Sequence, residues 1–131
     1  MARLKEYNGH YCESEYEYAF IGFLEAEGWK YSSGNNIHRV TKRDILIVDD
    51  FKKFIADTNP DLTEEEVTQI YDNVRLVGAE SDFATLHKVY GWMVNGVQFT
   101  PQDGLPRMIP LIDFDNLDKN IFRVVNQFTV E

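Results

Sequence analysis

Residues 122–130 read Phe-Arg-Val-Val-Asn-Gln-Phe-Thr-Val, a run rich in β-branched and aromatic residues that indicates a β-strand. Two earlier stretches, 97–100 and 108–114, have the same character. Turn-forming residues at 101–104 and 115–118 separate the three stretches. The last third of the chain therefore predicts three strands that follow one another in a meander and form one antiparallel sheet.

The rest of the chain predicts helices, because apolar residues recur there at three- and four-residue steps. The expected helices cover residues 13–27, 44–58, 64–77 and 82–95. Gly28 is expected to stop the first helix, and Thr63 and Glu66 have the spacing of a capping box at the start of the third. Helices followed by strands predict an α+β fold with a mainly antiparallel sheet, in a single domain over residues 1–131.

The chain is acidic, since its 131 residues include 13 Lys and Arg against 22 Asp and Glu, a formal net charge of −9. A field of this sign repels phosphates, which argues against a free-standing DNA- or RNA-binding module. Three classes stay open: an acidic metal-dependent enzyme, a non-enzymatic interaction domain, and a nucleic-acid mimic. Lys52, Lys53 and Lys119 interrupt the continuous acidic face that a mimic needs.

The sequence indicates a cytoplasmic protein. No apolar run is long enough to cross a membrane, and the N-terminus lacks the apolar segment of a signal peptide. Cys12 is the only cysteine, so it cannot form an internal disulfide and it suits a reducing compartment.

The clearest candidates for chemistry are Glu13 and Glu17, which lie one turn apart in the first predicted helix. Glu17 borders the apolar stripe that we expect to pack on the sheet through Phe20, Phe23 and Leu24. A carboxylate at that border can point into a semi-buried site, where a metal-assisted nuclease needs it near Mg²⁺ or its water. The alternative is an exposed helix face, on which acidic residues in the first turn complement the helix dipole.

Other patterns give little support for a ligand site. Asp113, Asp115 and Asp118 are spaced loosely like a calcium loop, but the required glycine and distal glutamate are absent, so we expect a turn. The three histidines and Cys12 lack the spacing of zinc ligands. No Gly-rich phosphate loop followed by a lysine occurs.

Two segments resemble the N-terminal nuclease region of type I restriction enzyme R subunits. The first segment is Glu17-Tyr18-Ala19-Phe20-Ile21, followed by Leu24 and Gly28-Trp29. The second is Ile112-Asp113-Phe114 with Asn120, followed by the run at 122–130, which is similar to that family's VVNQF strand. The similarity covers roughly residues 13–131.

The resemblance implies a restriction-endonuclease-like fold, in which helices flank a mixed sheet. It implies a large motor subunit that combines an Mg²⁺-dependent DNA nuclease with an ATP-driven translocase and works with modification and specificity subunits. Glu17 matches the place on the first helix where an acidic residue helps to position the metal or its waters. Glu13 is the second candidate.

The resemblance also implies that part of the site is missing. In the family, later strands carry an Arg-Pro-Asp and a Glu-x-Lys motif, whereas this sequence ends at Glu131 before either, and its Pro60-Asp61 lies in a predicted helix–helix loop. The motifs of the ATP-driven motor are absent too. We therefore expect a nuclease-domain fragment that folds, holds no cofactor and does not cut DNA alone. The strand at 122–130 would keep an edge open for self-association.

Overall fold

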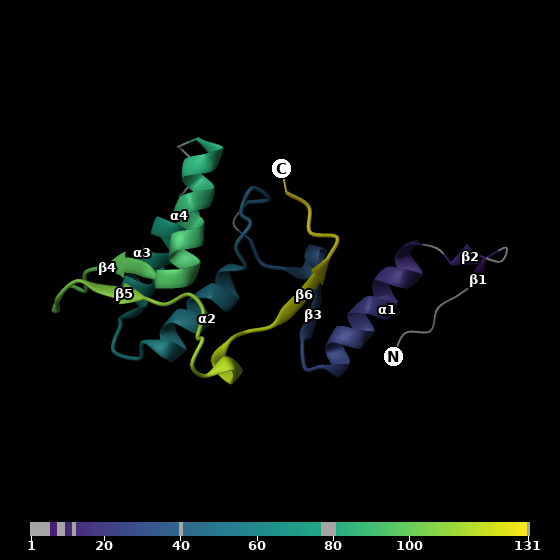
Figure 1. Cartoon of the computed structure of the whole chain (residues 1–131), viewed down its shortest axis with the longest axis horizontal. Coiled ribbons are helices and arrows are strands. Elements are labelled where there is room, and N and C mark those ends of the chain that lie inside the picture. The colour runs from purple at the N-terminus through teal and green to yellow at the C-terminus, as the bar shows by residue number, and fades with distance from the viewer. Residues whose placement is uncertain (1–5, 8–9, 12, 40, 77–80, 131) are drawn as a thin grey trace. The chain divides into compact units, whose positions relative to one another are not determined.

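The computed structural model of the 131-residue chain describes residues 6–7, 10–11, 13–39, 41–76 and 81–130. The chain divides into two compact units, residues 1–37 with 122–131 and residues 38–121. Helices and short strands occur in both units, which confirms the α+β class (Figure 1). The single domain over residues 1–131 stays a prediction. No helix in the described part of the chain is long and apolar enough to span a membrane.

In the first unit, a helix contacts a two-stranded parallel sheet. Helix α1 spans Glu13–Ala26, strand β3 spans Lys30–Ser33 and strand β6 spans Arg123–Asn126. A 3-10 turn, η1 (Gly34–Asn36), follows β3, while β1 (Glu6–Tyr7) and β2 (His10–Tyr11) form a short antiparallel pair. Figure 1 shows β3 and β6 side by side, and α1 contacts both strands.

Helix α1 ends at the glycine that the sequence predicts. Gly28 has a φ of 97°, a left-handed conformation that favours glycine. The Trp29 N–H donates to the Leu24 carbonyl at 3.1 Å and the Gly28 N–H donates to the Glu25 carbonyl at 3.0 Å, which is the bonding pattern of a Schellman cap. This tight reversal lets β3 fold back along α1.

The face through which α1 packs differs from the prediction. Ile21 is only 4% exposed and Leu24 is half-buried, whereas Phe20 and Phe23 are 63% and 64% exposed. The prediction was therefore wrong for the two phenylalanines. Phe20 and Ile21 point roughly 100° apart around the helix, and each lies in its own apolar stripe. Periodicity alone does not decide which of two stripes is buried.

The predicted three-stranded antiparallel sheet is correct only for its first two strands. Strands β4 (Val97–Phe99) and β5 (Arg107–Ile109) pair antiparallel, but β6 pairs in parallel with β3 instead. Pro110 follows β5 directly and has no N–H with which to extend the ladder. The sequence of β3, Lys-Tyr-Ser-Ser, lacks the Val and Ile that mark a strand, so its role as the partner of β6 was not predicted.

The described residues of the second unit form three helices, the β4–β5 hairpin and a 3-10 turn. Its helices are α2 (Val48–Thr58), α3 (Glu64–Arg75) and α4 (Asp82–Asn95), and its 3-10 turn is η2 (Leu117–Lys119). Helix α2 begins at Val48, later than the predicted Asp44. The Asp44 carboxylate accepts hydrogen bonds from the Thr41 N–H at 3.2 Å and from Arg75 at 2.9 Å. The capping box is confirmed by reciprocal bonds between Thr63 and Glu66, at 3.2 and 3.0 Å.

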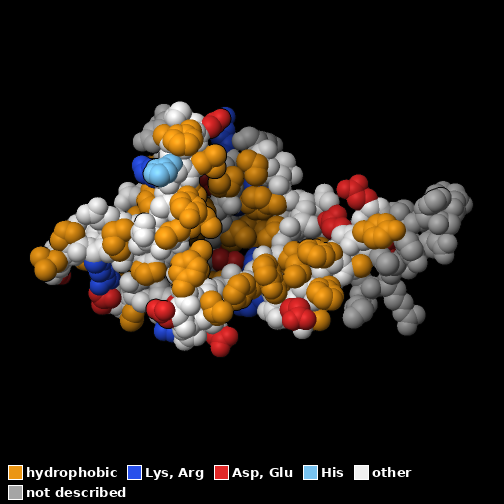
Figure 2. Space-filling view, viewed as in Figure 1, with side chains coloured by type: hydrophobic (Ala, Val, Ile, Leu, Met, Phe, Trp, Pro, Cys, Tyr) orange, Lys and Arg blue, Asp and Glu red, His pale blue; other side chains and the backbone are white. Residues whose placement is uncertain are grey.

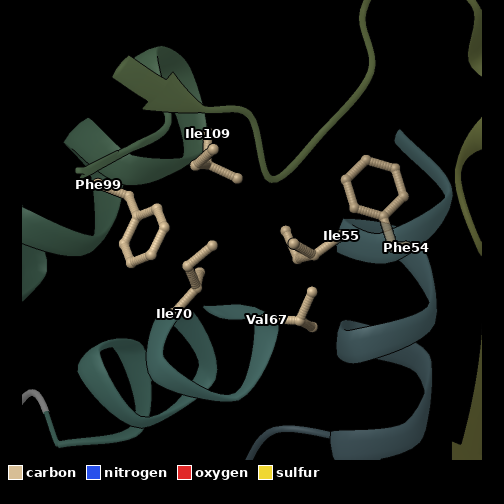
Figure 3. Packing of buried hydrophobic residues seen from close by; sticks show 6 residues of the cluster. All are labelled: Phe54, Ile55, Val67, Ile70, Phe99 and Ile109. Atoms are coloured by element: carbon tan, nitrogen blue, oxygen red, sulfur yellow. The ribbon is translucent and has the colours of Figure 1, made fainter. Parts of the chain in front are cut away.

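The core of the second unit lies between α2, α3 and the hairpin. Figure 3 shows the six buried side chains of this core cluster: Phe54 and Ile55 from α2, Val67 and Ile70 from α3, and Phe99 and Ile109 from the hairpin. Gly96 joins α4 to β4 with a φ of 89°, and a Cβ there would lie 2.6 Å from the Ile109 carbonyl oxygen. Glycine is therefore required at this junction.

Helix α4 contributes little to that core. It has no buried residue, and its apolar side chains are largely exposed, including Phe83, Leu86 and Tyr90. Their spacing of three and four residues places them on one face of the helix. Figure 2 shows many hydrophobic side chains on the surface of the molecule.

Candidate functional site

Glu17 lies on the same side of α1 as the buried Ile21, one turn earlier. Its side chain is half-buried, and both carboxylate oxygens lie 3.5 Å from Nε2 of Gln127. These contacts are long for hydrogen bonds, and they join residues 110 positions apart in the sequence. Glu13, one turn earlier still, is exposed. Glu17 is thus the member of the predicted pair that contacts the segment after β6.

Gln127 directly follows β6 and has an unusual backbone. Its φ is 53°, and it is the one non-glycine residue with a positive φ in the described part of the chain. Gly34, the first residue of η1, approaches it so closely that a Cβ would lie 2.3 Å from the Gln127 carbonyl oxygen. Only glycine leaves room for this approach, so the segments after β3 and after β6 are packed backbone to backbone.

Polar side chains join the two parallel strands on both faces. The register pairs Tyr31 with Val124 and Ser33 with Asn126, and alternate residues of a strand share a face. On one face the Tyr31 hydroxyl donates to Asn126 Oδ1 at 2.8 Å. On the other face Arg123 Nη1 donates to the Ser32 hydroxyl oxygen at 2.7 Å. These bonds help to fix the strand register without a large apolar core.

Glu17, Gln127 and Gly34 meet at one edge of this sheet. Because β3 and β6 run in the same direction, their carboxyl ends, Ser33 and Asn126, lie side by side. The contact with Gln127 brings the Glu17 carboxylate to that edge. Ligands of sheets with parallel strands bind beyond the carboxyl ends of the strands. This edge is therefore the candidate functional site of the first unit.

The site supplies only part of what a metal ion needs. Across residues 13–39, 41–76 and 81–130, no three His, Cys, Asp or Glu side chains are grouped so that they could hold a metal. Mg²⁺ prefers several oxygen ligands in octahedral geometry. Glu17 suits that chemistry as one oxygen ligand, but the described residues do not complete the set. Cys12 lies outside the described residues.

The turn predicted for residues 113–118 is confirmed. Asp113 Oδ1 accepts from the N–H groups of Asp115 at 3.1 Å and Asn116 at 2.8 Å, which is a side-chain-capped turn. The Asn120 side chain accepts from the Asp113 N–H and donates to the Asp113 carbonyl, both at 2.8 Å. The carboxylate of Asp113 is thus used by its own loop.

A second polar cluster ties the β4–β5 loop to the start of α3. Arg107 contacts both carboxylate oxygens of Asp61, at 2.8 and 3.3 Å, and these bonds hold the pKa of Asp61 below its usual value. Glu66 accepts from the backbone N–H groups of Thr63 and Gln102, at 3.0 and 3.1 Å, and these bonds lower the pKa of Glu66. These bonds attach the β4–β5 hairpin to the start of α3 within the second unit.

Sequence reasoning identified Glu17 but missed its neighbours. Gln127 was placed inside a strand, where nothing distinguishes it from any other polar strand residue. Its sequence signal is weak: a polar pair, Asn126 and Gln127, interrupts an apolar run. The close approach of Gly34 to the backbone after β6 depends on a strand pairing that the sequence did not predict.

Comparison with known proteins decides the family. The sequence model described as type I restriction enzyme R protein N terminus (HSDR_N) matches residues 11–131. This chain belongs to that family. It is also 35% identical over 124 residues to a protein of Methanocaldococcus jannaschii named "Putative type I restriction enzyme MjaIXP endonuclease subunit". That match covers 88% of this chain and 12% of the relative's length. No solved structure matches the chain significantly.

Four residues of the segments that resemble R proteins make contacts in the structure that explain their positions. Asp113 and Asn120 are hydrogen-bonded to each other and close the loop between them. The Asn126 and Gln127 positions contact Tyr31 and Glu17 respectively. The first pair stabilises a turn in the second unit, whereas the second pair joins separate elements at the candidate site of the first.

Proposed function

We propose that this chain forms the N-terminal part of a nuclease domain in a type I restriction endonuclease R subunit. The family match over residues 11–131 carries this proposal. The complete subunit would have a restriction-endonuclease-like fold, hydrolyse DNA with Mg²⁺ after ATP-driven translocation, and act in the cytoplasm with modification and specificity subunits. The chain spans 12% of the length of its named relative, so these activities are proposed for a larger protein.

Glu17 is the carboxylate that we propose this region contributes to DNA cleavage, with Glu13 as the weaker candidate. Three observations support Glu17: it is half-buried, it lies at the carboxyl edge of two parallel strands, and it contacts a residue after β6. Glu13 is exposed. A bound Mg²⁺ would stabilise the charge that develops on the phosphate. Glu17 would supply one oxygen ligand, and further ligands would come from strands beyond those described here.

The chain alone is expected to fold without cutting DNA. One carboxylate holds Mg²⁺ weakly, because the ion releases its waters reluctantly and prefers several oxygen ligands. A net charge of −9 also removes the non-specific attraction for DNA. Incubating plasmid with the pure 131-residue chain and excess Mg²⁺ or Mn²⁺ tests this expectation. Nicking that EDTA and Glu17→Ala both abolish would overturn it.

The reading frame after codon 131 provides a first test of the larger proposal. Pro-Asp and Glu-x-Lys motifs are expected within a few tens of residues, followed by motor motifs. A frame without them would contradict the assignment to a complete R subunit.

The second test uses the complete subunit assembled with its partners. Glu17→Gln should lower Mg²⁺-dependent cleavage of DNA and spare ATP hydrolysis, which we assign to a separate motor domain. Glu25→Gln is the matched control, because Glu25 is an exposed carboxylate on the same helix. Wild-type cleavage by the Glu17→Gln subunit would remove Glu17 from the site.

A further inference from the structure

Gln127 occupies a backbone conformation that glutamine rarely adopts. Its φ of 53° lies in the left-handed region, which is unfavourable for residues with a Cβ other than Asn and Asp. A strained residue of this kind persists only where the surrounding structure holds it, and such residues cluster at functional sites.

The backbone of Gln127 passes directly against Gly34. A Cβ at position 34 would lie 2.3 Å from the Gln127 carbonyl oxygen and 2.7 Å from Cα of Phe128. Gly34 is buried, and its own φ is not in the left-handed region. Glycine is therefore needed at position 34 for space, and that space is occupied by the backbone that presents Gln127.

The side chain of Gln127 is directed at Glu17. Nε2 lies 3.5 Å from both carboxylate oxygens, so the amide spans the carboxylate instead of binding one oxygen. An ionised carboxylate can only accept hydrogen bonds, and the amide nitrogen can only donate them. The contact therefore restricts the directions in which the Glu17 side chain can point.

We propose that Gln127 is a positioning residue that holds the Glu17 carboxylate at the carboxyl edge of β3 and β6. The proposal rests on the proposed function of Glu17 and adds a reason for the backbone strain. Glycine or asparagine would adopt the backbone conformation at position 127 with less strain. The contact made by the glutamine side chain therefore explains why glutamine occupies this position. Residues that orient a functional carboxylate typically change activity by roughly 10- to 100-fold when they are lost.

Two substitutions separate positioning from stability. Gln127→Gly relieves the backbone and removes the amide, while Gln127→Asn suits the backbone and withdraws the amide by one methylene. Both variants of the 131-residue chain should melt at or above the wild-type temperature. In the complete subunit, both should lower DNA cleavage roughly 10- to 100-fold with unchanged ATP hydrolysis. A merely structural role predicts the opposite, unchanged cleavage wherever the fold is retained.

The exchanged pair Glu17→Gln/Gln127→Glu provides a stricter test. It restores an amide–carboxylate contact but moves the carboxylate from α1 to the segment after β6. We expect the exchange to recover thermal stability relative to Gln127→Glu alone, where two carboxylates face each other, and not to recover cleavage. Recovery of both would show that the contact is structural only and would overturn the proposal.

A spectroscopic readout tests the contact without any activity. In the 131-residue chain labelled with ¹⁵N, Glu17→Gln should shift the side-chain amide resonances of Gln127, and Glu25→Gln should leave them in place. Unchanged resonances in Glu17→Gln would overturn the contact even if a Gln127 variant failed to fold.

The two proposals fail in different ways. If Glu17→Gln abolishes cleavage while Gln127→Gly folds and cuts at the wild-type rate, only the positioning role is overturned. If Glu17→Gln itself cuts at the wild-type rate, the proposed function of Glu17 is overturned, and the role of Gln127 falls with it.

Discussion

The two units of the molecule are held together in different ways. All but one of the buried hydrophobic side chains in the described part of the chain belong to residues 38–121, and the exception is Ile21 on α1. The second unit has an apolar core between two helices and a hairpin. The first unit joins segments about 90 residues apart through a two-stranded parallel sheet, with polar bonds such as that between Tyr31 and Asn126.

This difference matters for function, because the candidate site lies in the unit with less buried apolar surface. Two-stranded sheets are marginally stable in water, and parallel strands usually lie in larger sheets that are covered on both faces. Among the described residues, β6 is the neighbour of β3 in this sheet. The other side of β6 is the proposed place for a further strand of the complete subunit, or for a second copy of the chain.

The largest expected effect comes from the core of the second unit. Ile70 is fully buried between α3 and its neighbours, so Ile70→Ala should lower the free energy of unfolding by about 4 kcal/mol, through lost burial and a cavity. Urea denaturation followed by circular dichroism measures this change. Leu86→Ala on α4 is the control, because Leu86 is 70% exposed and should change stability little. Equal losses for the two variants would contradict the assignment of the core.

The same truncation in the first unit should cost less. Ile21→Ala truncates the one buried hydrophobic side chain among the described residues of this unit, but a thin helix-on-sheet layer can close around the gap, so we expect about 2 kcal/mol. Phe20→Ala, at the adjacent and exposed position, should cost well under 1 kcal/mol. Hydrogen exchange at the amides of β6 reports which variant loosens the first unit. A larger effect at Phe20 would restore the packing face that the sequence suggested.

The sequence predicted the second unit better than the first, because the contacts that shape the second unit join residues closer together in the sequence. The capping box at Thr63 and Glu66, the turn at Asp113 and the β4–β5 pairing all depend on contacts within a few tens of residues. Local propensity and turn chemistry act at that range. The pairing of β3 with β6 depends instead on tertiary context, because Lys-Tyr-Ser-Ser has no strand signature of its own.

For the candidate site too, the sequence indicated only the residue that has a local signal. Glu17 is a candidate from the sequence because it borders an apolar stripe of the first helix, which is a local signal. Its role in a site stays a prediction. Gln127 and Gly34 were missed because their importance arises only when β3 and β6 pair. A left-handed glutamine has no sequence signal, whereas a left-handed glycine such as Gly28 does.

A glycine comparison tests the contact between the two strand ends. Gly34→Ala would place a Cβ 2.3 Å from the Gln127 carbonyl oxygen, so the backbone must shift, and we expect a loss of about 2 kcal/mol. Gly91→Ala lies within α4, where a Cβ meets no atom within 4 Å, and it should stabilise the chain by about 0.5–1 kcal/mol. Thermal melts of both variants measure the difference. A neutral Gly34→Ala would show that the two segments are not tightly packed.

The smallest expected effect is a pH dependence in the second unit. The backbone N–H groups of Thr63 and Gln102 lower the pKa of Glu66 from its ordinary value of 4.5, so the folded chain favours the ionised carboxylate more than the unfolded chain does. The resulting stabilisation is complete above the unfolded pKa of Glu66 and is lost as the pH falls through its lower, folded pKa.

A variant of Glu66 that cannot titrate tests this pH dependence. Glu66→Gln keeps an oxygen acceptor for the capping box but has no ionisable group. Melting temperatures between about pH 6 and pH 3 should therefore fall less steeply for Glu66→Gln than for wild type. Glu65→Gln, at an exposed neighbouring position on α3, should follow the wild-type curve. Coincident curves for all three proteins would show that Glu66 does not couple protonation to the attachment of the β4–β5 loop.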